Sequence, residues 1–368
     1  MAEILDQAVL GAAHSNVRDG RVVVTQNPVI KKLLIVTDAW QPQVNGVVRT
    51  LGNTRSQLEA LGMAVEMLTP QSFKTLPCPS YPEIRLSLTT RGRVQQMIEA
   101  INPDALHIAT EGPLGWAARG VAVACQWTFT TAYHTRFPEY VNARIGIPLS
   151  WSYALFRRFH GASSAVLAPT PAIVEDLRTR GFNHVVHWTR GVDHAIFYPR
   201  IEQIPPNKTN PIFLYAGRLA IEKNVEAFLR LDLPGQKWVA GEGPMTVTLK
   251  KKYPNARYIG VVSQDELAHL YSQADVFVFP SLTDTFGLVM AEAMACGLPV
   301  AAFPVMGPID VVGQSGAGVL DEDLRAACLA CLDISRDRAT ARASQFTWSV
   351  ATAQFFAVLK PMRARSES

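Results

Sequence analysis

The sequence contains no apolar run long enough to cross a membrane, because none approaches the roughly 18–20 residues that a spanning helix needs. Its first residues, MAEILDQAVLGAAHSNVRDG, include neither a basic stretch nor a long apolar segment, so they do not read as a signal peptide. Both observations favour a cytoplasmic protein. No G-x-G-x-x-G turn follows the apolar run that begins at Lys32, which argues against a nicotinamide-dependent dehydrogenase.

Cysteine is scarce, and the five that occur cannot pair completely, as expected in a reducing compartment. Cys328 and Cys331 form a C-x-x-C, but no second pair or nearby histidine completes a zinc site. Residues three apart share a helix face, so the two cysteines are expected on the buried stripe of a helix. We therefore predict neither a metal site nor a redox site at these cysteines.

The charge is unevenly distributed along the chain. Residues 31–200 contain 17 Lys and Arg against 11 Asp and Glu, whereas residues 201–368 contain 16 against 17. A basic first half suits nucleic acid, an anionic membrane or a phosphorylated ligand. No nucleic-acid motif accompanies the charge, so we expect no nucleic-acid partner and favour the other two.

From Lys31 onward, short β-rich runs alternate with helical stretches, which predicts an α/β fold with doubly wound parallel sheets. The segment IEQIPPNKTNP then interrupts the pattern as a proline-rich linker, and the alternation restarts after it. Two such halves place a ligand cleft between them, at the carboxyl ends of their strands. The predicted parts are an N-terminal extension over 1–30, a first Rossmann-like domain over 31–204, a second over 205–345, and a C-terminal helix over 346–368 that crosses back to the first.

The segment SLTDTFGLVMAEAMACGLPV, residues 281–300, is the most informative. A helix beginning near Phe286 leaves its first N–H groups unpaired, and with the helix dipole they form an anion pocket. Asp284 and Glu292 are eight residues apart, which spans roughly 12 Å along a helix and suits two carboxylates at opposite ends of one ligand. Alternatively, Asp284 is only an N-cap and Glu292 a solvated residue, although an unpaired charge in so apolar a helix is costly. The backbone donors predicted here are those of Phe286, Gly287 and Leu288.

The segment LYAGRLAIEKNVEAF, residues 214–228, places Arg218 after a buried strand and Lys223 at the start of the next helix. Two cations on one strand-to-helix turn can close on a pyrophosphate and neutralise a departing diphosphate. The alternative is that both are ordinary surface cations.

Three turns in the first half also end predicted strands. Gly46 precedes a helix and allows close backbone approach, although an Asn-Gly pair is as often a plain turn. His134 ends the TFTTAYHT strand, where a histidine can hydrogen-bond a substrate hydroxyl, although a lone histidine is more often structural. The candidates for the acceptor side of the cleft are Asn45, Glu111 and Arg136.

The stretch IPLSWSYALFRRFHG mixes aromatic and cationic residues, a combination that suits the headgroup layer of an anionic bilayer. The membrane-contact candidates are Trp151, Phe156, Arg157 and Arg158. A core helix with a charged rim is the alternative.

Taken together, these segments resemble the retaining glycosyltransferases of the large GT-B family four, the glycosyl transferases group 1, over about residues 32 to 345. The donor motif E-x7-E of that family reads D-x7-E here, from Asp284 to Glu292. The resemblance implies that Glu292 holds the ribose hydroxyls and that Asp284, one methylene shorter than the family's glutamate, contacts the transferring sugar. It also implies a GT-B fold with two Rossmann-like domains.

The resemblance further places Arg218 and Lys223 on the diphosphate, His134 near the donor sugar, and the Gly46 turn over the donor. It implies metal-independent transfer with retention, with a nucleoside-diphosphate sugar as donor substrate and no cofactor. It assigns no carboxylate nucleophile, and Glu111 is the candidate to test.

The first half is similar to bacterial family members that act on membrane lipids. This implies transfer of a hexose or uronic acid, with a UDP-sugar favoured, to a lipid at the anionic cytoplasmic face of the inner membrane. Three alternatives stay open: a GDP-mannose-dependent alpha-mannosyltransferase, a nucleotide-sugar 2-epimerase, and a non-catalytic sugar-nucleotide sensor.

Overall fold

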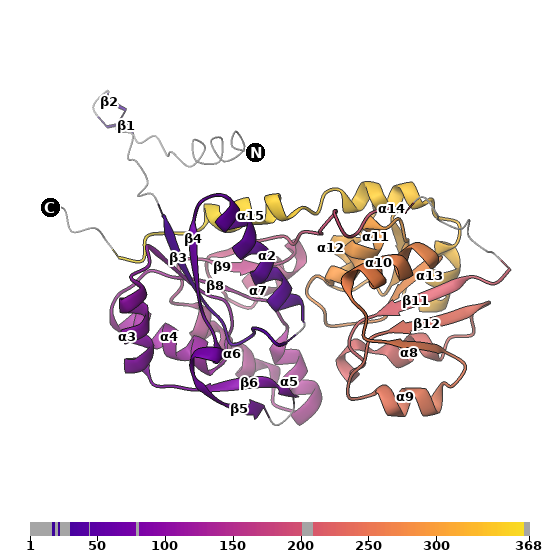
Figure 1. The fold of residues 1–368 in the computed structure, drawn as a ribbon, viewed down its shortest axis with the longest axis horizontal. Helices are drawn as coiled ribbons and strands as arrows, with labels where there is room; N and C mark the ends of the chain where they lie inside the picture. Colours follow the sequence, from indigo (N-terminus) through magenta and orange to yellow (C-terminus); the bar gives the residue numbers. More distant parts are fainter. Residues whose placement is uncertain are drawn as a thin grey trace.

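A computed structural model gives the fold of the chain, which forms two α/β domains lying side by side (Figure 1). Most of the predicted N-terminal extension and part of the predicted linker lie outside the described residues; within the extension, β1 (Val17–Arg18) pairs antiparallel with β2 (Arg21–Val22). The residues described are 17–18, 21–22, 30–43, 45–78, 81–200 and 209–363.

The first domain is built on a six-stranded sheet in the order β10-β9-β8-β7-β3-β4, with every pair parallel. An antiparallel hairpin, β5-β6, is inserted between β4 and α3. The strands are β3 (Lys32–Val36), β4 (Ala64–Leu68), β5 (Lys74–Cys78), β6 (Tyr81–Leu88), β7 (Ala105–Ile108), β8 (Thr130–Ala132), β9 (Val166–Ala168) and β10 (Val185–His187). The helices are α2 (Gly46–Ala60), η1 (Pro70–Ser72), α3 (Arg91–Ile101), α4 (Pro113–Ala124), α5 (Phe137–Ile145), α6 (Leu149–His160) and α7 (Pro171–Thr179).

The second domain repeats the plan with the order β13-β12-β11-β14-β15-β16, again all parallel. The strands are β11 (Ile212–Ala216), β12 (Gln236–Ala240), β13 (Arg257–Gly260), β14 (Val276–Phe279), β15 (Val300–Ala302) and β16 (Gly318–Leu320). The helices are η2 (Ile221–Lys223), α8 (Val225–Leu229), α9 (Thr246–Lys252), α10 (Gln264–Gln273), α11 (Leu288–Ala295), α12 (Pro308–Val311), α13 (Leu324–Cys331) and α14 (Arg336–Ala343). The predicted doubly wound α/β class is confirmed.

The strands bury both faces, as parallel strands covered by helices must. Successive side chains of a strand point to opposite faces, so Leu33 and Ile35 join the core under α2, whereas Leu34 and Val36 join the core under α3 and α4. This explains why the run KKLLIVTD is apolar without alternation.

A last helix, α15 (Trp348–Ala357), leaves the second domain and packs on α2 of the first. Figure 1 shows it in yellow above the first domain, with α14 above the second. The indole Nε1 of Trp188 donates to the carbonyl of Ala351 at 3.0 Å, and Phe355 is fully buried beside it. The C-terminal helix therefore belongs to the core of the first domain.

None of the helices in the described part of the chain has the length and apolar character that a membrane span requires.

Candidate active site

The strand order of the second sheet locates a crevice. Chain connections from β11 and β14 leave toward opposite sides, so a space opens outside the carboxyl ends of these neighbouring strands. The segment after β11 carries Arg218 and Lys223, and the segment after β14 carries Asp284. Two turns that are distant in sequence thus meet at one sheet edge.

Lys223 and Asp284 form an ion pair there, with Lys223 Nζ donating to Asp284 Oδ1 at 2.5 Å. The other carboxylate oxygen, Oδ2, is buried and has no partner among the described residues. Burial pushes the pKa of Lys223 down, but Asp284 and the nearby Tyr140 outweigh it, and the pKa lies above its ordinary value. Lys223 is therefore a fixed cation with further N–H donors, suited to binding an anion.

Tyr140 reaches this pair from α5 of the first domain. Burial raises the pKa of its hydroxyl, which lies beside Lys223, Asp284 and Thr283. The first domain thus closes one side of the Lys223–Asp284 pair.

The helix predicted to start near Glu222 begins later. A 3-10 turn over Ile221–Lys223 ends at Asn224, whose φ of 51° is left-handed, and α8 starts only at Val225. The Asn224 amide donates to the carbonyl of Pro280 at 3.0 Å and so joins the Lys223 turn to the loop after β14. Arg218 is half-buried at the end of β11, where its carbonyl accepts from the Tyr215 hydroxyl at 2.9 Å.

The helix α11 also begins later than predicted, at Leu288 instead of near Phe286. Phe286 is buried, and its ring packs edge-on against Phe346, so it belongs to the loop and the core. Gly287 has a φ of 78°, and a Cβ there would lie 2.8 Å from Phe279 Cζ. Only glycine fits this left-handed position without strain, and the free N–H groups of the helix start with Leu288.

Glu292, on α11, is 2% exposed and forms an ion pair with Arg49 of α2 in the first domain. Its second oxygen, Oε2, is buried without a partner among the described residues. Burial raises the pKa of Glu292, and Arg49 opposes that shift. The side-chain amide of Gln264 also lies beside Arg49. When its oxygen is placed on the side of Arg49, it accepts from Arg49 Nη2 at 2.7 Å.

Gly46 heads α2 opposite the start of α11. A Cβ on Gly46 would lie 3.7 Å from Leu288 Cδ1, which is an ordinary contact. Gly46 is therefore close to the second domain without being sterically required there. The first residues of α2 and α11 therefore lie close together where the two domains meet.

His134 lies two residues beyond β8, and its carbonyl accepts from the Thr285 hydroxyl at 2.6 Å. The hydroxyl of Thr170 donates to the carbonyl of Thr285 at 3.4 Å. Ring atom Nε2 of His134 is buried and has no partner among the described residues, and burial lowers the pKa of the ring well below its ordinary value. His134 is thus a neutral ring placed directly against the loop that carries Asp284.

The predicted acceptor-side residues are dispersed. Asn45 caps α2, accepting from the N–H groups of Val47 and Val48 at 3.0 Å. Glu111 Oε1 pairs with Nε2 of the buried His160 at 3.1 Å. In this geometry the Asn45 side chain has a structural role.

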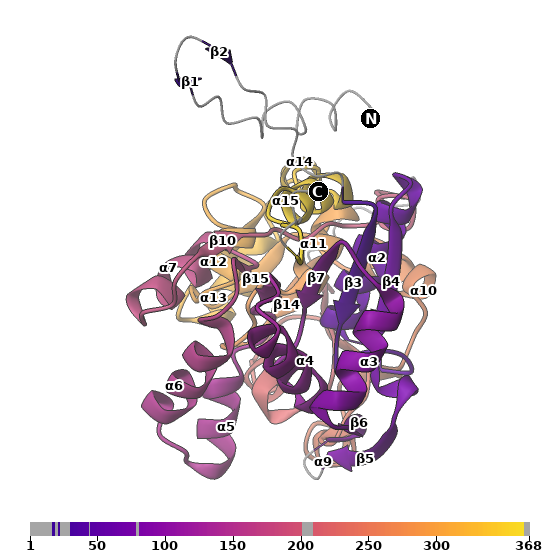
Figure 2. The ribbon, with the colours of Figure 1, turned by 90° about the vertical axis from the view of Figure 1, so that its left-hand side faces the viewer.

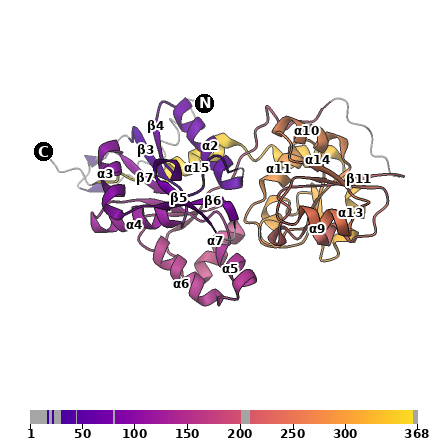
Figure 3. The same ribbon diagram turned by 60° about the horizontal axis from the view of Figure 1, so that its bottom comes forward.

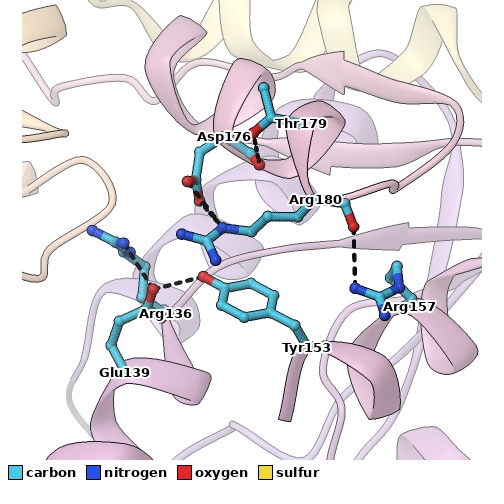
Figure 4. Close-up of polar contacts among 7 residues, drawn as sticks. All are labelled: Arg136, Glu139, Tyr153, Arg157, Asp176, Thr179 and Arg180. Atoms are coloured by element: carbon cyan, nitrogen blue, oxygen red, sulfur yellow. Dashed lines mark hydrogen bonds and ion pairs between the residues drawn. The ribbon is translucent and has the colours of Figure 1, made fainter. Parts of the chain in front are cut away.

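Arg136 belongs to a polar network that joins α5, α6 and α7 (Figure 4). Its guanidinium donates to Glu139 Oε1 at 2.7 Å, and the Tyr153 hydroxyl donates to the same oxygen at 2.6 Å. Arg180 lies over the Tyr153 ring at 4.1 Å and pairs with Asp176 at 2.9 Å. These contacts fix α5 and α6 to the domain, and with them Tyr140.

The membrane-contact prediction needs a correction at two of its four residues. Phe156 is half-buried against Tyr133, and Arg157 donates to the carbonyl of Arg180 at 3.1 Å, so both lie on the inner side of α6. The exposed stripe of α6 is formed instead by Trp151, Leu155 and Arg158, with Trp151 73% exposed. Helical periodicity explains the difference, because residues 151, 155 and 158 share a face.

Cys328 and Cys331 both lie on the buried side of α13. Burial raises the pKa of the Cys331 thiol to about 12. In the part of the chain that the structure describes, no three His, Cys, Asp or Glu side chains gather as a possible metal site.

Four residues of the interdomain region were not identified from the sequence: Arg49, Tyr140, Arg190 and Thr285. Arg49 follows Gly46 by one helical turn, so helical spacing on α2 was the available signal. The other three join the site through contacts between distant segments, and local pattern gives no sign of them.

Two family models match the chain. Residues 44–196 match the model described as Glycosyltransferase Family 4, and residues 210–337 match the one described as Glycosyl transferases group 1. Between them they span both domains.

Curated relatives align over much of the chain. A GDP-mannose-dependent alpha-mannosyltransferase of Mycolicibacterium smegmatis is 30% identical over 78% of this chain and 84% of its own length. The sulfoquinovosyl transferase SQD2 of Arabidopsis thaliana is 31% identical over 67% of this chain, but the match spans only 51% of that protein. The alpha-monoglucosyldiacylglycerol synthase of Streptococcus pneumoniae is 25% identical over 73% of this chain and 70% of its length.

Solved structures share the fold. Sucrose-phosphate synthase of Thermosynechococcus elongatus superimposes with a TM-score of 0.68 at 20% identity, covering 89% of this chain and 97% of that one. Anabaena HepE, solved in complex with UDP and glucose, gives a TM-score of 0.63 at 17% identity over 89% and 98%. At these identities the likeness establishes the two-domain GT-B architecture.

Proposed function

The chain belongs to glycosyltransferase family 4, the glycosyl transferases group 1, and on this premise we propose that it transfers a hexose or uronic acid from a nucleoside-diphosphate sugar to a membrane lipid. The observation that carries the proposal is the Lys223–Asp284 pair at the carboxyl ends of β11 and β14, facing Tyr140 and His134 of the other domain. The proposal also draws on the unpartnered oxygens of two buried carboxylates, Asp284 Oδ2 and Glu292 Oε2, and on the N-terminus of α11.

For the donor, we assign the diphosphate to Lys223, Arg218 and the first N–H groups of α11. Lys223 supplies a permanent charge, and the helix dipole adds to it. Glu292 Oε2 is the acceptor we assign to the ribose hydroxyls, and Asp284 Oδ2 is the one we assign to the transferring sugar. Asp284 is one methylene shorter than the family's glutamate. In our assignment its Oδ1 holds Lys223, and its Oδ2 is left for the sugar.

The reaction then breaks the bond between the anomeric carbon and the diphosphate oxygen, and the electron pair leaves with the diphosphate. Lys223 and the helix N-terminus neutralise the charge that develops on that oxygen, the kind of preorganised stabilisation that dominates many enzymes. The acceptor hydroxyl forms the new bond on the same face and passes its proton to the departing oxygen, giving retention. Glu111, bonded to His160, stays the carboxylate to test as a nucleophile.

We place the membrane contact through which the lipid acceptor is reached at α6, α3 and the β5-β6 hairpin of the first domain. Trp151 and Leu155 are 73% and 51% exposed on α6, and Figures 2 and 3 show α5 and α6 projecting from one side of this domain. Burial lowers the pKa of Arg119, and the neighbouring Arg158 and Arg91 lower it further, with no carboxylate among the groups that shift it. Three clustered cations beside exposed apolar side chains suit an anionic bilayer, which is how a monotopic enzyme reaches a lipid.

A recess of about 500 Å³ beside the hairpin, lined in part by Lys74, Leu88 and Arg93, adds two cations to this side of the domain. It lies on the first domain alone, away from the Lys223–Asp284 pair. We therefore assign it to the membrane-facing side and keep the chemistry between the domains.

Two candidate donors differ in their nucleotide base. A UDP-sugar is the first, in keeping with the solved HepE complexes. GDP-mannose is the second, and the 30% identical mannosyltransferase favours it. Thermal-shift measurements with UDP-glucose, UDP-glucuronate, GDP-mannose and the free nucleotides test both, because a ligand that binds the folded chain raises the melting temperature, and a tighter ligand raises it more at equal concentration.

The transfer itself is tested by incubating the protein with radiolabelled donor and anionic lipid vesicles. We expect label in the lipid fraction. Label confined to the water-soluble fraction overturns the lipid acceptor, and donor consumed without any acceptor identifies a 2-epimerase. A sensor is identified if His134→Ala and Lys223→Ala weaken nucleotide binding but leave the cellular glycolipids unchanged.

A further inference from the structure

Arg190 is a buried cation that lacks a carboxylate partner. It lies shortly after β10, which ends at His187, is 3% exposed, and takes part in none of the ion pairs found among the described residues. Its Nη1 donates to the carbonyls of Trp188 and Thr189 at 2.6 and 3.1 Å, and its guanidinium lies 4.2 Å from the centre of the Trp188 ring. Burying a guanidinium without a counter-ion is costly, and here burial lowers the pKa of Arg190 to about 9.

One side chain accepts a hydrogen bond from this cation: Nη2 of Arg190 faces Nδ1 of His134 at 3.3 Å. A guanidinium can only donate, so Nδ1 must be the acceptor. The single proton of the neutral ring is therefore on Nε2. That Nε2–H is buried and has no partner within the described chain, which leaves it to a ligand.

The charges around His134 act in the same direction. Burial lowers the pKa of His134 most, and the groups that lower it further are Arg190 after β10, His107 on β7 and His160 on α6. From the second domain, the hydroxyl of Thr285 contacts His134 at the backbone carbonyl. Groups from three separate elements thus favour the neutral form of the His134 ring.

Arg190 is itself immobilised by the helix that crosses back from the second domain. The N–H of Thr189 donates to Gln354 Oε1 at 2.8 Å, and Trp188 is tied to α15. At the next residue, Gly191, a Cβ would lie 2.3 Å from the backbone nitrogen of Trp348. The chain at Arg190 is consequently pressed against α15 and has little freedom to move.

We infer that Arg190 is a positioning residue for the transfer reaction: its guanidinium holds His134 in the tautomer that presents Nε2–H as a donor to a hydroxyl oxygen of the donor sugar. The inference rests on the proposed function only in naming the sugar. Arg190 acts through His134 and is not assigned any contact with substrate.

The first test reads the ring directly and needs no turnover. The full chain labelled with ¹⁵N and ¹³C histidine is titrated by NMR, with His134→Asn identifying the resonance. We expect a neutral ring protonated on Nε2 in the parent and in Arg190→Lys, which keeps a charged donor. Arg190→Met should mix the two tautomers and raise the pKa of His134 by about one unit or more, because both the donor and the nearby charge are lost. An unchanged tautomer and pKa in Arg190→Met overturn the inference.

The second test is kinetic and uses Arg178→Met as a matched control, since Arg178 also donates to a backbone carbonyl, that of Val185, but forms no hydrogen bond with a histidine among the described residues. Arg190→Met should lower kcat by about tenfold or more with little change in donor KM, and its acid limb should move to higher pH; Arg190→Lys should recover most of the rate. Equal losses in Arg190→Lys and Arg190→Met, with an unmoved pH profile, make Arg190 merely structural. If the NMR result holds and no nucleotide sugar is turned over, the proposed function fails while the positioning role stands.

Discussion

Arg49 of α2 and Glu292 of α11 form an ion pair between the two domains, and Glu292 keeps its second oxygen free of protein partners among the described residues. The carboxylate that we assign to the donor ribose is therefore shared with the first domain. If this assignment holds, we expect donor binding and the relative position of the domains to be coupled through this one side chain.

Arg49→Met should weaken nucleotide binding and make it more sensitive to pH. Burial already raises the pKa of Glu292 and Arg49 opposes this, so removing Arg49 raises it further. A carboxylate that protonates at higher pH loses its acceptor oxygen earlier as pH falls. Calorimetric titration with UDP and GDP between pH 5.5 and 8 measures the effect, with Arg55→Met, exposed on the same helix, as control. Equal affinity of Arg49→Met and parent at every pH contradicts the coupling.

Lys223→Met should lower kcat by roughly 10²- to 10³-fold, the loss typical of removing one preorganised donor from a developing anion. Asp284→Asn should cost less, because the amide oxygen still accepts from Lys223 while the charge on the sugar side is lost. Steady-state rates with saturating donor measure both. Lys251→Met, on the exposed side of α9, should match the parent; comparable losses at Lys251 and Lys223 argue against the assigned role.

The free energy of unfolding should fall as pH decreases from about 6.5 toward about 3. Burial, with Arg190 adding to it, lowers the pKa of His107 to about 3, so between these values the unfolded chain binds one more proton at this site than the folded chain does. Stability rises with pH wherever the unfolded state binds more protons, and this contribution is fully present above pH 6.5. At pH 5.5 the loss is about 1.4 kcal/mol for this residue.

Denaturant unfolding of His107→Asn tests this prediction, since the amide can keep the bond to Thr130, which is 2.8 Å in the parent. Between pH 5 and 6.5, the free energy of unfolding of the variant should depend less steeply on pH than that of the parent, by up to the slope that one bound proton gives. The same replacement at the exposed His269 is the control. Identical slopes for parent and His107→Asn show that His107 does not carry the dependence.

Gly287→Ala should destabilise the chain by about 1–3 kcal/mol, because its φ of 78° is strained for alanine and its Cβ would meet the Phe279 ring at 2.8 Å. Gly52→Ala is the matched control. Gly52 lies inside α2 with no atom within 4 Å of the added Cβ, so this change should stabilise by about 0.4–1 kcal/mol. Thermal unfolding of the two variants should therefore show shifts of opposite sign.

The double change Trp151→Ser and Leu155→Ser should reduce sedimentation with anionic vesicles, since it removes the apolar part of the exposed face of α6. Arg158→Glu should act in the same direction and make the remaining binding less dependent on salt. Val247→Ser, at a residue 80% exposed on the second domain, is the control. Vesicle binding that is equal in all these variants moves the membrane contact elsewhere.

Much of the fold was predictable because it depends on local pattern. The alternation of β-rich runs with helical stretches from Lys31 onward predicted the parallel sheets, because the spacing of apolar residues within each short segment indicates a strand or a helix. The D-x7-E spacing placed Asp284 and Glu292 in one continuous segment, and the structure has Glu292 on α11 and Asp284 in the loop before that helix.

The errors arose where distant segments decide the outcome. The late start of α8 follows from Asn224 in a left-handed conformation bonded to Pro280, which no pattern around Lys223 reveals. The inward orientation of Phe156 follows from packing against Tyr133. Arg49 and Glu292 are 243 residues apart in sequence, so only the folded chain could pair them.

The chain passes between the domains twice, once after Arg190 and again before Trp348, and the two passages touch where the Val192 N–H donates to the carbonyl of Phe346 at 3.1 Å. The two connections between the domains therefore adjoin one another in the fold. The first domain also depends on the end of the chain. Removing the last twenty residues would take Phe355 and its neighbours out of the core of this domain, which is synthesised first. A truncation near the carboxyl end should therefore destabilise the amino-terminal domain.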